Sequence, residues 1–148
     1  MSQAAAINNI TKATNELIFV IKKENALLAA GQSSAIKNVI EEKVDALCKF
    51  NAAQSTIDSY LKQGLKFDKD YPPAVKLMEL FNTLDQLNQQ NDVLIRSNLE
   101  VSNIFVEIYK ETRAQEALRQ FGYNKQGKVS VDGKIEKVMP AIGLNNKV

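Results

Sequence analysis

The residues that could carry chemistry in this sequence are few and isolated. The 148-residue chain has no histidine and a single cysteine, Cys48. It therefore lacks the commonest general base and the commonest zinc ligand, and one thiol cannot form an intrachain disulfide. Because no histidine is present to activate it, Cys48 is interpreted as a small packing residue rather than a nucleophile. The sequence indicates neither an enzyme nor a protein with a metal or organic cofactor.

Two other patterns only partly match chemical motifs. The segment 122–129 has the glycines and the lysine of a phosphate-binding loop, but it lacks a Ser or Thr after Lys128 and a preceding strand. Glu41 and Glu42 lie near Asp45, but no histidine follows a glutamate at the spacing of a di-iron site. These carboxylates are interpreted as a solvent-exposed helix face.

The elements that would position these residues are predicted to be long helices. Apolar residues recur at alternating intervals of three and four residues, which is typical of coiled-coil packing. A first helix is expected over about residues 4–30 and ends before Gly31; a second is expected over about residues 35–63 and ends before Gly64. The short turn at Gly31 would make them antiparallel neighbours. The expected seam residues are Ile7, Ile10, Thr14, Leu17, Ile21, Glu24 and Leu28, then Ile36, Ile40, Lys43, Leu47, Phe50, Gln54, Ile57 and Leu61.

The third segment, about residues 74–121, is predicted to be one uninterrupted helix, because it contains no glycine or proline. At 1.5 Å per residue it would be about 70 Å long, against about 40–45 Å for each of the first two. Its last turns would therefore extend beyond its partners and expose apolar side chains. The expected seam is Leu77, Leu80, Leu84, Leu87, Asn91, Leu94, Asn98, Val101, Phe105 and Ile108.

The predicted fold class is therefore all-α: an antiparallel three-helix bundle, or coiled-coil hairpin, with one long C-terminal helix. Residues 1–121 would form the bundle domain and residues 122–148 a flexible basic tail with five lysines against Asp132 and Glu136. The net charge of +2 is too small for a nucleic-acid-binding surface. The longest strongly apolar run, residues 17–21, is too short for membrane insertion, and no secretory signal is apparent, so a cytosolic protein is expected.

Two asparagines interrupt the apolar seam of the third segment. A buried asparagine costs stability but penalises wrong alignments, so Asn91 and Asn98 would set the register of the helices. The alternative is that they leave a polar stretch for a guest helix. The narrow seams allow two further interpretations, a groove for an amphipathic helix of another protein or pairing into a homo-oligomer. The residues alone leave these alternatives open.

Four segments, in their order and spacing, resemble the FlgN family of flagellar export chaperones. The resemblance covers roughly residues 5–130. The segments are Glu24-Asn25-Ala26-Leu27-Leu28-Ala29-Ala30-Gly31-Gln32, Glu42-Lys43 with Leu47, Leu87-Asn88-Gln89-Gln90-Asn91 with Leu94, and Phe121-Gly122-Tyr123-Asn124 with Gly127.

This resemblance implies a function. FlgN-like proteins bind C-terminal helical segments of the hook–filament junction (hook-associated) proteins in the bacterial cytosol, keep them unassembled and deliver them to the flagellar type III export gate. By this resemblance Tyr123 would contact the export-gate protein. The other functions considered are a structural or self-associating coiled-coil protein and a helical chaperone of another secretion system. The residues expected to bind the client are Asn98, Val101, Phe105, Ile108, Tyr109, Leu118 and Phe121.

Overall fold

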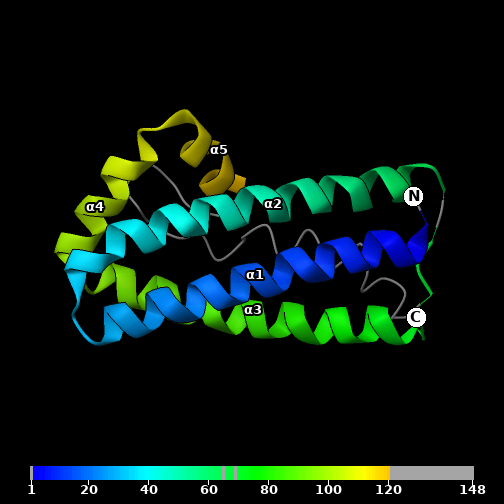
Figure 1. Ribbon diagram of the computed structural model, residues 1–148, viewed down its shortest axis with the longest axis horizontal. Coiled ribbons are helices and arrows are strands. Elements are labelled where there is room, and N and C mark those ends of the chain that lie inside the picture. Colours follow the sequence, from blue (N-terminus) through cyan, green and yellow to red (C-terminus); the bar gives the residue numbers. More distant parts are fainter. Residues whose placement is uncertain (1, 65, 69, 121–148) are drawn as a thin grey trace.

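The computed structural model describes residues 2–64, 66–68 and 70–120, and the elements within these ranges are all helical (Figure 1). The prediction of an all-α helical bundle is confirmed. Residues 121–148, which include the tail expected at 122–148, lie outside the described residues. The elements are α1 (Gln3–Ala29), the short 3-10 helix η1 (Ser33–Ala35), α2 (Ile36–Lys62), α3 (Pro72–Arg96), α4 (Leu99–Tyr109) and α5 (Thr112–Gln120).

The first two helices begin and end close to the predicted positions. The Ser2 side chain accepts a hydrogen bond from the Ala5 amide at 3.1 Å and so caps the N-terminus of α1. Gly31 and Gly64 follow α1 and α2 with φ angles of +69° and +82°. A residue with a Cβ is strained in this left-handed conformation, so these two glycines end the helices at low cost.

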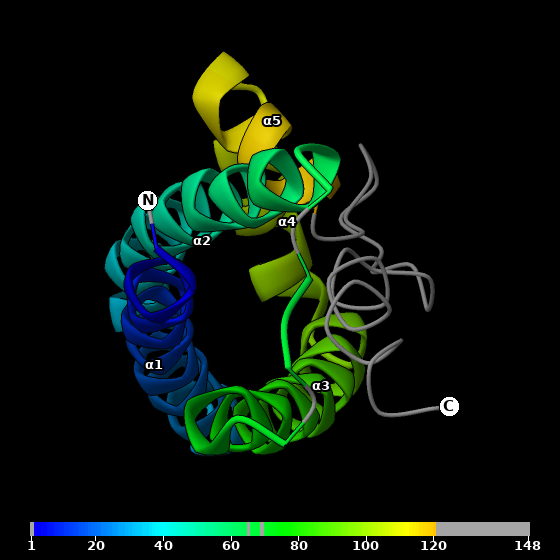
Figure 2. The same cartoon turned by 90° about the vertical axis from the view of Figure 1, so that its right-hand side faces the viewer.

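The first three helices lie on an arc with α1 in the middle (Figure 2). α1 packs along both α2 and α3, whereas α2 and α3 make few backbone contacts with each other. α1 runs antiparallel to α2 and parallel to α3 (Figure 1). All the expected seam residues of α1 and α2 are buried except Leu61, which is half-buried. The seams of these two helices are therefore confirmed.

The seam predicted for α3 is only partly correct. The positions predicted correctly are Leu77, Leu84 and Asn91, but the intervening positions are shifted by one residue. The buried residues of α3 are Ala74, Leu77, Phe81, Leu84, Asn88, Asn91 and Ile95, whereas Leu80, Leu87 and Leu94 are half-buried. Phe81 packs edge-on against Phe50 of α2, with 6.3 Å between the ring centroids. α3 is thus turned toward α2 on one flank while it lies along α1 on the other.

The prediction of one long helix over 74–121 is wrong, because the chain turns at Ser97 and Asn98. Asn98 has an extended backbone, with φ −123° and ψ 100°, and its side chain accepts from the Val101 amide at 3.1 Å, which caps α4. The Ser102 hydroxyl donates to the Ile95 carbonyl at 2.8 Å and so links the two sides of the turn. Side chains of this kind compete with helical hydrogen bonds, which explains a break without glycine or proline.

The predicted overhang is also wrong, because α4 and α5 fold back onto the bundle. α5 packs on α2, and α4 contacts both α2 and α3 (Figure 1). Ile108, Tyr109 and Leu118 are only 8%, 6% and 0% exposed. The apolar side chains that were expected to reach beyond the bundle are therefore covered by their own chain, apart from Phe121, which lies outside the described residues.

We predict that Asn98→Ala lowers the free energy of unfolding by about 1 kcal/mol, because it removes the N-cap of α4. Urea denaturation followed by circular dichroism measures this change. Ser97→Ala is the matched control: its exposed hydroxyl bonds only the Leu94 carbonyl within the last turn of α3, and its loss should cost under about 0.5 kcal/mol. Equal losses in the two variants would show that the Asn98 side chain does not hold the turn.

Candidate functional site

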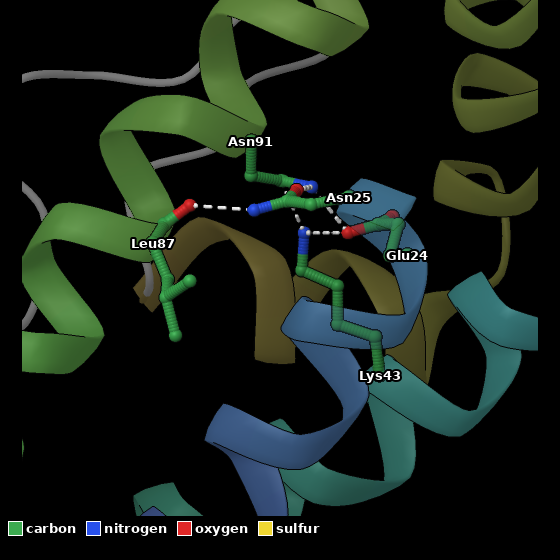
Figure 3. Close-up of polar contacts among 5 residues, drawn as sticks. All are labelled: Glu24, Asn25, Lys43, Leu87 and Asn91. Carbon is green, nitrogen blue, oxygen red and sulfur yellow. Dashed lines mark hydrogen bonds and ion pairs between the residues drawn. The ribbon is translucent and has the colours of Figure 1, made fainter. Parts of the chain in front are cut away.

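A buried polar network joins α1, α2 and α3 (Figure 3). The Lys43 ammonium donates to Glu24 Oε1 at 3.0 Å and to Asn91 Oδ1 at 2.8 Å. Asn91 Nδ2 donates in turn to Glu24 Oε1 and to Asn25 Oδ1, and Asn25 Nδ2 donates to the Leu87 carbonyl at 3.1 Å. The side chains of Lys43 and Glu24 are fully buried. Each of the three helices therefore supplies a group that the other two require.

This network favours one alignment of the three helices along their axes. Removing a lysine and a glutamate from water is costly, and the cost is offset only where their hydrogen bonds are made. A shift of α3 by one turn would take Asn91 away from the Lys43–Glu24 pair and leave buried charge under-satisfied. The geometry therefore favours register control by Asn91, whereas Asn98 serves as the cap of α4.

The network also reaches α4. The Lys43 ammonium lies 5.5 Å from the centroid of the Phe105 ring, close enough for a cation–π interaction. Phe105 is fully buried. The position of α4 is thus tied to the same lysine that aligns the first three helices. The sequence analysis placed Glu24 and Lys43 in the seams of their helices but did not predict that they pair. Their opposite charges at seam positions of neighbouring helices were the signal that could have predicted the pair.

α5 is a nine-residue amphipathic helix docked on α2. Its buried face consists of two alanines and Leu118, and the small Ala114 and Ala117 allow the helix to lie close to α2. Arg113 on α5 forms an ion pair with Asp45 on α2. The half-buried Cys48 of α2 has a raised pKa, through burial and the negative charges of two glutamates of the returning segment, Glu116 and Glu111. The pKa of Cys48 therefore depends on whether this segment is docked on α2.

The residues predicted to bind a client are brought together, but not on an open surface. Val101, Phe105, Ile108, Tyr109 and Leu118 are all buried in α4 and α5. Asn98 is half-buried at the start of α4. The two remaining predicted site residues, Phe121 and Tyr123, lie outside the described residues. Five of the predicted client-binding residues therefore belong to the core that α4 and α5 form with the rest of the bundle, and their assignment to a client stays a prediction.

Sequence reasoning missed a second surface, a shallow groove between α1 and α2. The groove has a volume of about 450 Å³ and is lined by Phe19, Val20 and Ala46 together with charged side chains. The Phe19 side chain is 67% exposed. Ion pairs join α1 and α2 beside it, Lys23 to Glu42 at 2.6 Å and Lys49 to Glu16 at 3.2 Å. Exposed pairs of this kind contribute little to stability.

Comparison with protein-family models, with curated proteins and with solved structures finds no match to this chain. None of the helices in the described ranges combines the length and the apolar character needed to cross a bilayer. In the same ranges no group of three or more His, Cys, Asp or Glu side chains is arranged to hold a metal ion. The feature with the clearest binding geometry in these ranges is the surface of α2 that receives α5.

We predict that Lys43→Met lowers the free energy of unfolding by about 3–5 kcal/mol, because it leaves the Glu24 carboxylate buried without its cation. Urea denaturation measures the loss. Lys49→Met is the matched control: it breaks the exposed pair with Glu16 and should cost no more than about 1 kcal/mol. The triple variant Glu24→Leu, Lys43→Met and Asn91→Leu should regain most of the loss. A Lys43→Met variant no less stable than Lys49→Met would contradict this view of the network.

Proposed function

We propose that this protein is a cytosolic flagellar export chaperone that works by binding rather than by catalysis. Its client would be the C-terminal helical segment of a hook-associated protein, which it keeps unassembled and delivers to the type III export gate. The flagellar part of the proposal rests on the resemblance to the FlgN family. One structural observation carries the binding part: α2 holds an amphipathic helix, α5, on a surface outside the seam that it shares with α1.

The contact between α5 and α2 is small enough for another helix to replace it. Leu118 is the only large apolar side chain in α5. Full burial of one leucine contributes roughly 1.5–3 kcal/mol, and a helix of about nine residues is marginal on its own in water. A client helix of three or four turns, with apolar residues at every third or fourth position, would bury more surface on α2. Such a client would therefore displace α5.

Competition with α5 also suits the task of a chaperone. A client segment with an uncovered apolar face tends to associate with its own kind, and a complementary helix face prevents this. The free energy of docking α5 is subtracted from the free energy of binding the client, so the affinity is moderated. The return of α5 to α2 would then favour release of the client at the export gate.

We predict that Leu118→Asp raises the affinity for the client about tenfold, which corresponds to about 1.4 kcal/mol of α5 docking that no longer opposes binding. The probes are synthetic C-terminal segments of the hook-associated proteins of a flagellated host, and isothermal calorimetry measures the dissociation constants. Arg119→Ser, on the exposed face of α5, is the matched control and should leave the affinity unchanged.

An independent signal shows whether α5 has left α2 in these variants. The pKa of Cys48 is raised by burial and by Glu116 and Glu111, so release of the segment lowers that pKa and speeds alkylation by iodoacetamide at pH 8. Fast alkylation of Leu118→Asp with unchanged client affinity would exclude the α2 surface as the client site. Absence of binding to any of the segments by either protein would contradict the flagellar proposal itself.

We further predict that Tyr123→Ala leaves client binding unchanged and reduces export several-fold, because the resemblance assigns this residue to the export gate. The measurement is the amount of hook-associated protein secreted by a host that carries the variant in place of its own chaperone gene. Tyr123→Phe, which keeps the ring, is the control that separates loss of the ring from loss of the hydroxyl. Loss of client binding by Tyr123→Ala would instead place the client site beyond residue 120.

A further inference from the structure

The groove between α1 and α2 is longer than its first part, which contains Phe19 and Ala46. A second part, of about 350 Å³, continues it along the same two helices and has three alanines in its lining, Ala13, Ala52 and Ala53. Glu16 and Lys49 line both parts, so the two form one depression, which we call the α1–α2 groove. It spans residues 42–56 of α2, about 21 Å at 1.5 Å per residue.

Phe19 is a large apolar side chain at a groove lined by small ones. It is 67% exposed, and it is the only aromatic residue among the exposed large apolar side chains of the described ranges. The Lys23 ammonium lies 5.8 Å from the centroid of its ring, which leaves most of the ring in water. Interfaces between proteins favour aromatic side chains that fit against complementary pockets. Phe19 and the alanines therefore have the two shapes that an interface brings together.

Two ion pairs bridge the α1–α2 groove in opposite senses. In the first the acid is on α1 and the base on α2, with Glu16 Oε2 3.2 Å from Lys49 Nζ. In the second, two turns further along α1, the base is on α1 and the acid on α2, with Lys23 Nζ 2.6 Å from Glu42 Oε2. The charges therefore change sign both across the groove and along it.

Phe19 lies level with Ala46 between these two ion pairs. α1 and α2 are antiparallel (Figure 1). Phe19 is three residues after Glu16 on α1, and Ala46 is three residues before Lys49 on α2. Equal steps from a paired position reach the same height on antiparallel helices. The large side chain of α1 therefore has the small side chain of α2 directly across the groove.

The α1–α2 groove has no net charge. Its other charged lining residues are Lys12 and Asp45, of which Asp45 also pairs with Arg113 of α5. Together with Lys23, the lysines at the groove equal the carboxylates in number. Such a surface does not select a strongly basic or strongly acidic partner. It selects a partner whose charges follow the same pattern with the signs exchanged.

A second copy of the chain supplies that inverted pattern. A two-fold axis parallel to the helices places α1 of each copy over α2 of the other, at the same height and antiparallel. Glu16 then faces Lys49 of the second copy, and Lys23 faces Glu42 of the second copy. In the same arrangement Phe19 faces Ala46 of the second copy. Charge and side-chain size are therefore complementary under one symmetry operation.

We propose that two copies of this protein associate face to face through the α1–α2 groove, each placing its Phe19 over Ala46 of the other. The four helices then pack as an antiparallel four-helix bundle. A contact two helices wide and about 21 Å long belongs to the small interfaces of transient complexes, so we expect a dissociation constant on the order of 10–100 μM. The proposal does not depend on the proposed flagellar function.

Sedimentation velocity of the full-length protein tests the association, and the mass should rise from monomer to dimer between about 5 and 500 μM. Phe19→Asp should weaken dimerisation at least tenfold, because the contact would then bury a carboxylate. Val93→Asp is the matched control: Val93 is 66% exposed on α3 and lies outside the groove, so dimerisation should be unchanged. A monomer at all concentrations would overturn the proposal and leave the groove to a different protein. Equal effects of the two substitutions would overturn it as well.

A pair of charge reversals tests which side chains meet. Glu16→Lys alone and Lys49→Glu alone each place like charges opposite one another between identical copies, so each should weaken dimerisation at least tenfold. An equimolar mixture of the two variants should restore the dimer, because every charge at these positions then faces its opposite in the other variant. Circular dichroism verifies that both variants stay helical. A mixture no more associated than its separate components, or single variants that dimerise as well as the unmodified protein, would contradict this contact.

Discussion

The structure depends on the burial of one ion pair. Lys43 and Glu24 are both removed from water, and Asn91 supplies hydrogen bonds to each of them that offset part of this cost. This requirement orients α3, because it turns Asn91 toward the pair and therefore turns the neighbouring positions Phe81 and Asn88 toward α2. The same ammonium faces the Phe105 ring, so α4 packs against the group that aligns the first three helices. The break after α3 is made locally, by the Asn98 cap and the Ser102 hydroxyl, and the buried charge contributes to where α4 then lies.

Local signals explain why the first two helices were predicted closely and the third was not. Gly31 and Gly64 end their helices by adopting a positive φ, which does not depend on tertiary contacts. The ends of α1 and α2 could therefore be predicted from the sequence. In α3 two sets of apolar residues have helical spacing, one that contains Leu80 and one that contains Phe81. The set with Phe81 is the buried one because Phe81 packs against Phe50 of α2, a contact that the spacing alone does not reveal. The break at Asn98 did have a signal, an asparagine, which is a preferred N-cap residue, followed by the acidic Glu100 in the next turn. Because Asn98 also continues the spacing of the expected apolar seam, it was interpreted as a seam residue within one helix.

The fold-back changes what the predicted client residues mean. Five of them are buried side chains of α4 and α5, Val101, Phe105, Ile108, Tyr109 and Leu118, because apolar side chains on a single chain are covered by a complementary surface where one is within reach. That surface is α2, and the small side chains of α5 give it only Leu118 as a large anchor. A short helix with one large apolar side chain can be replaced by a longer amphipathic helix, so burial of these residues is compatible with the proposed binding role. Under the proposed function the free energy of client binding would be reduced by the free energy of docking α5, because a client would first have to displace this helix.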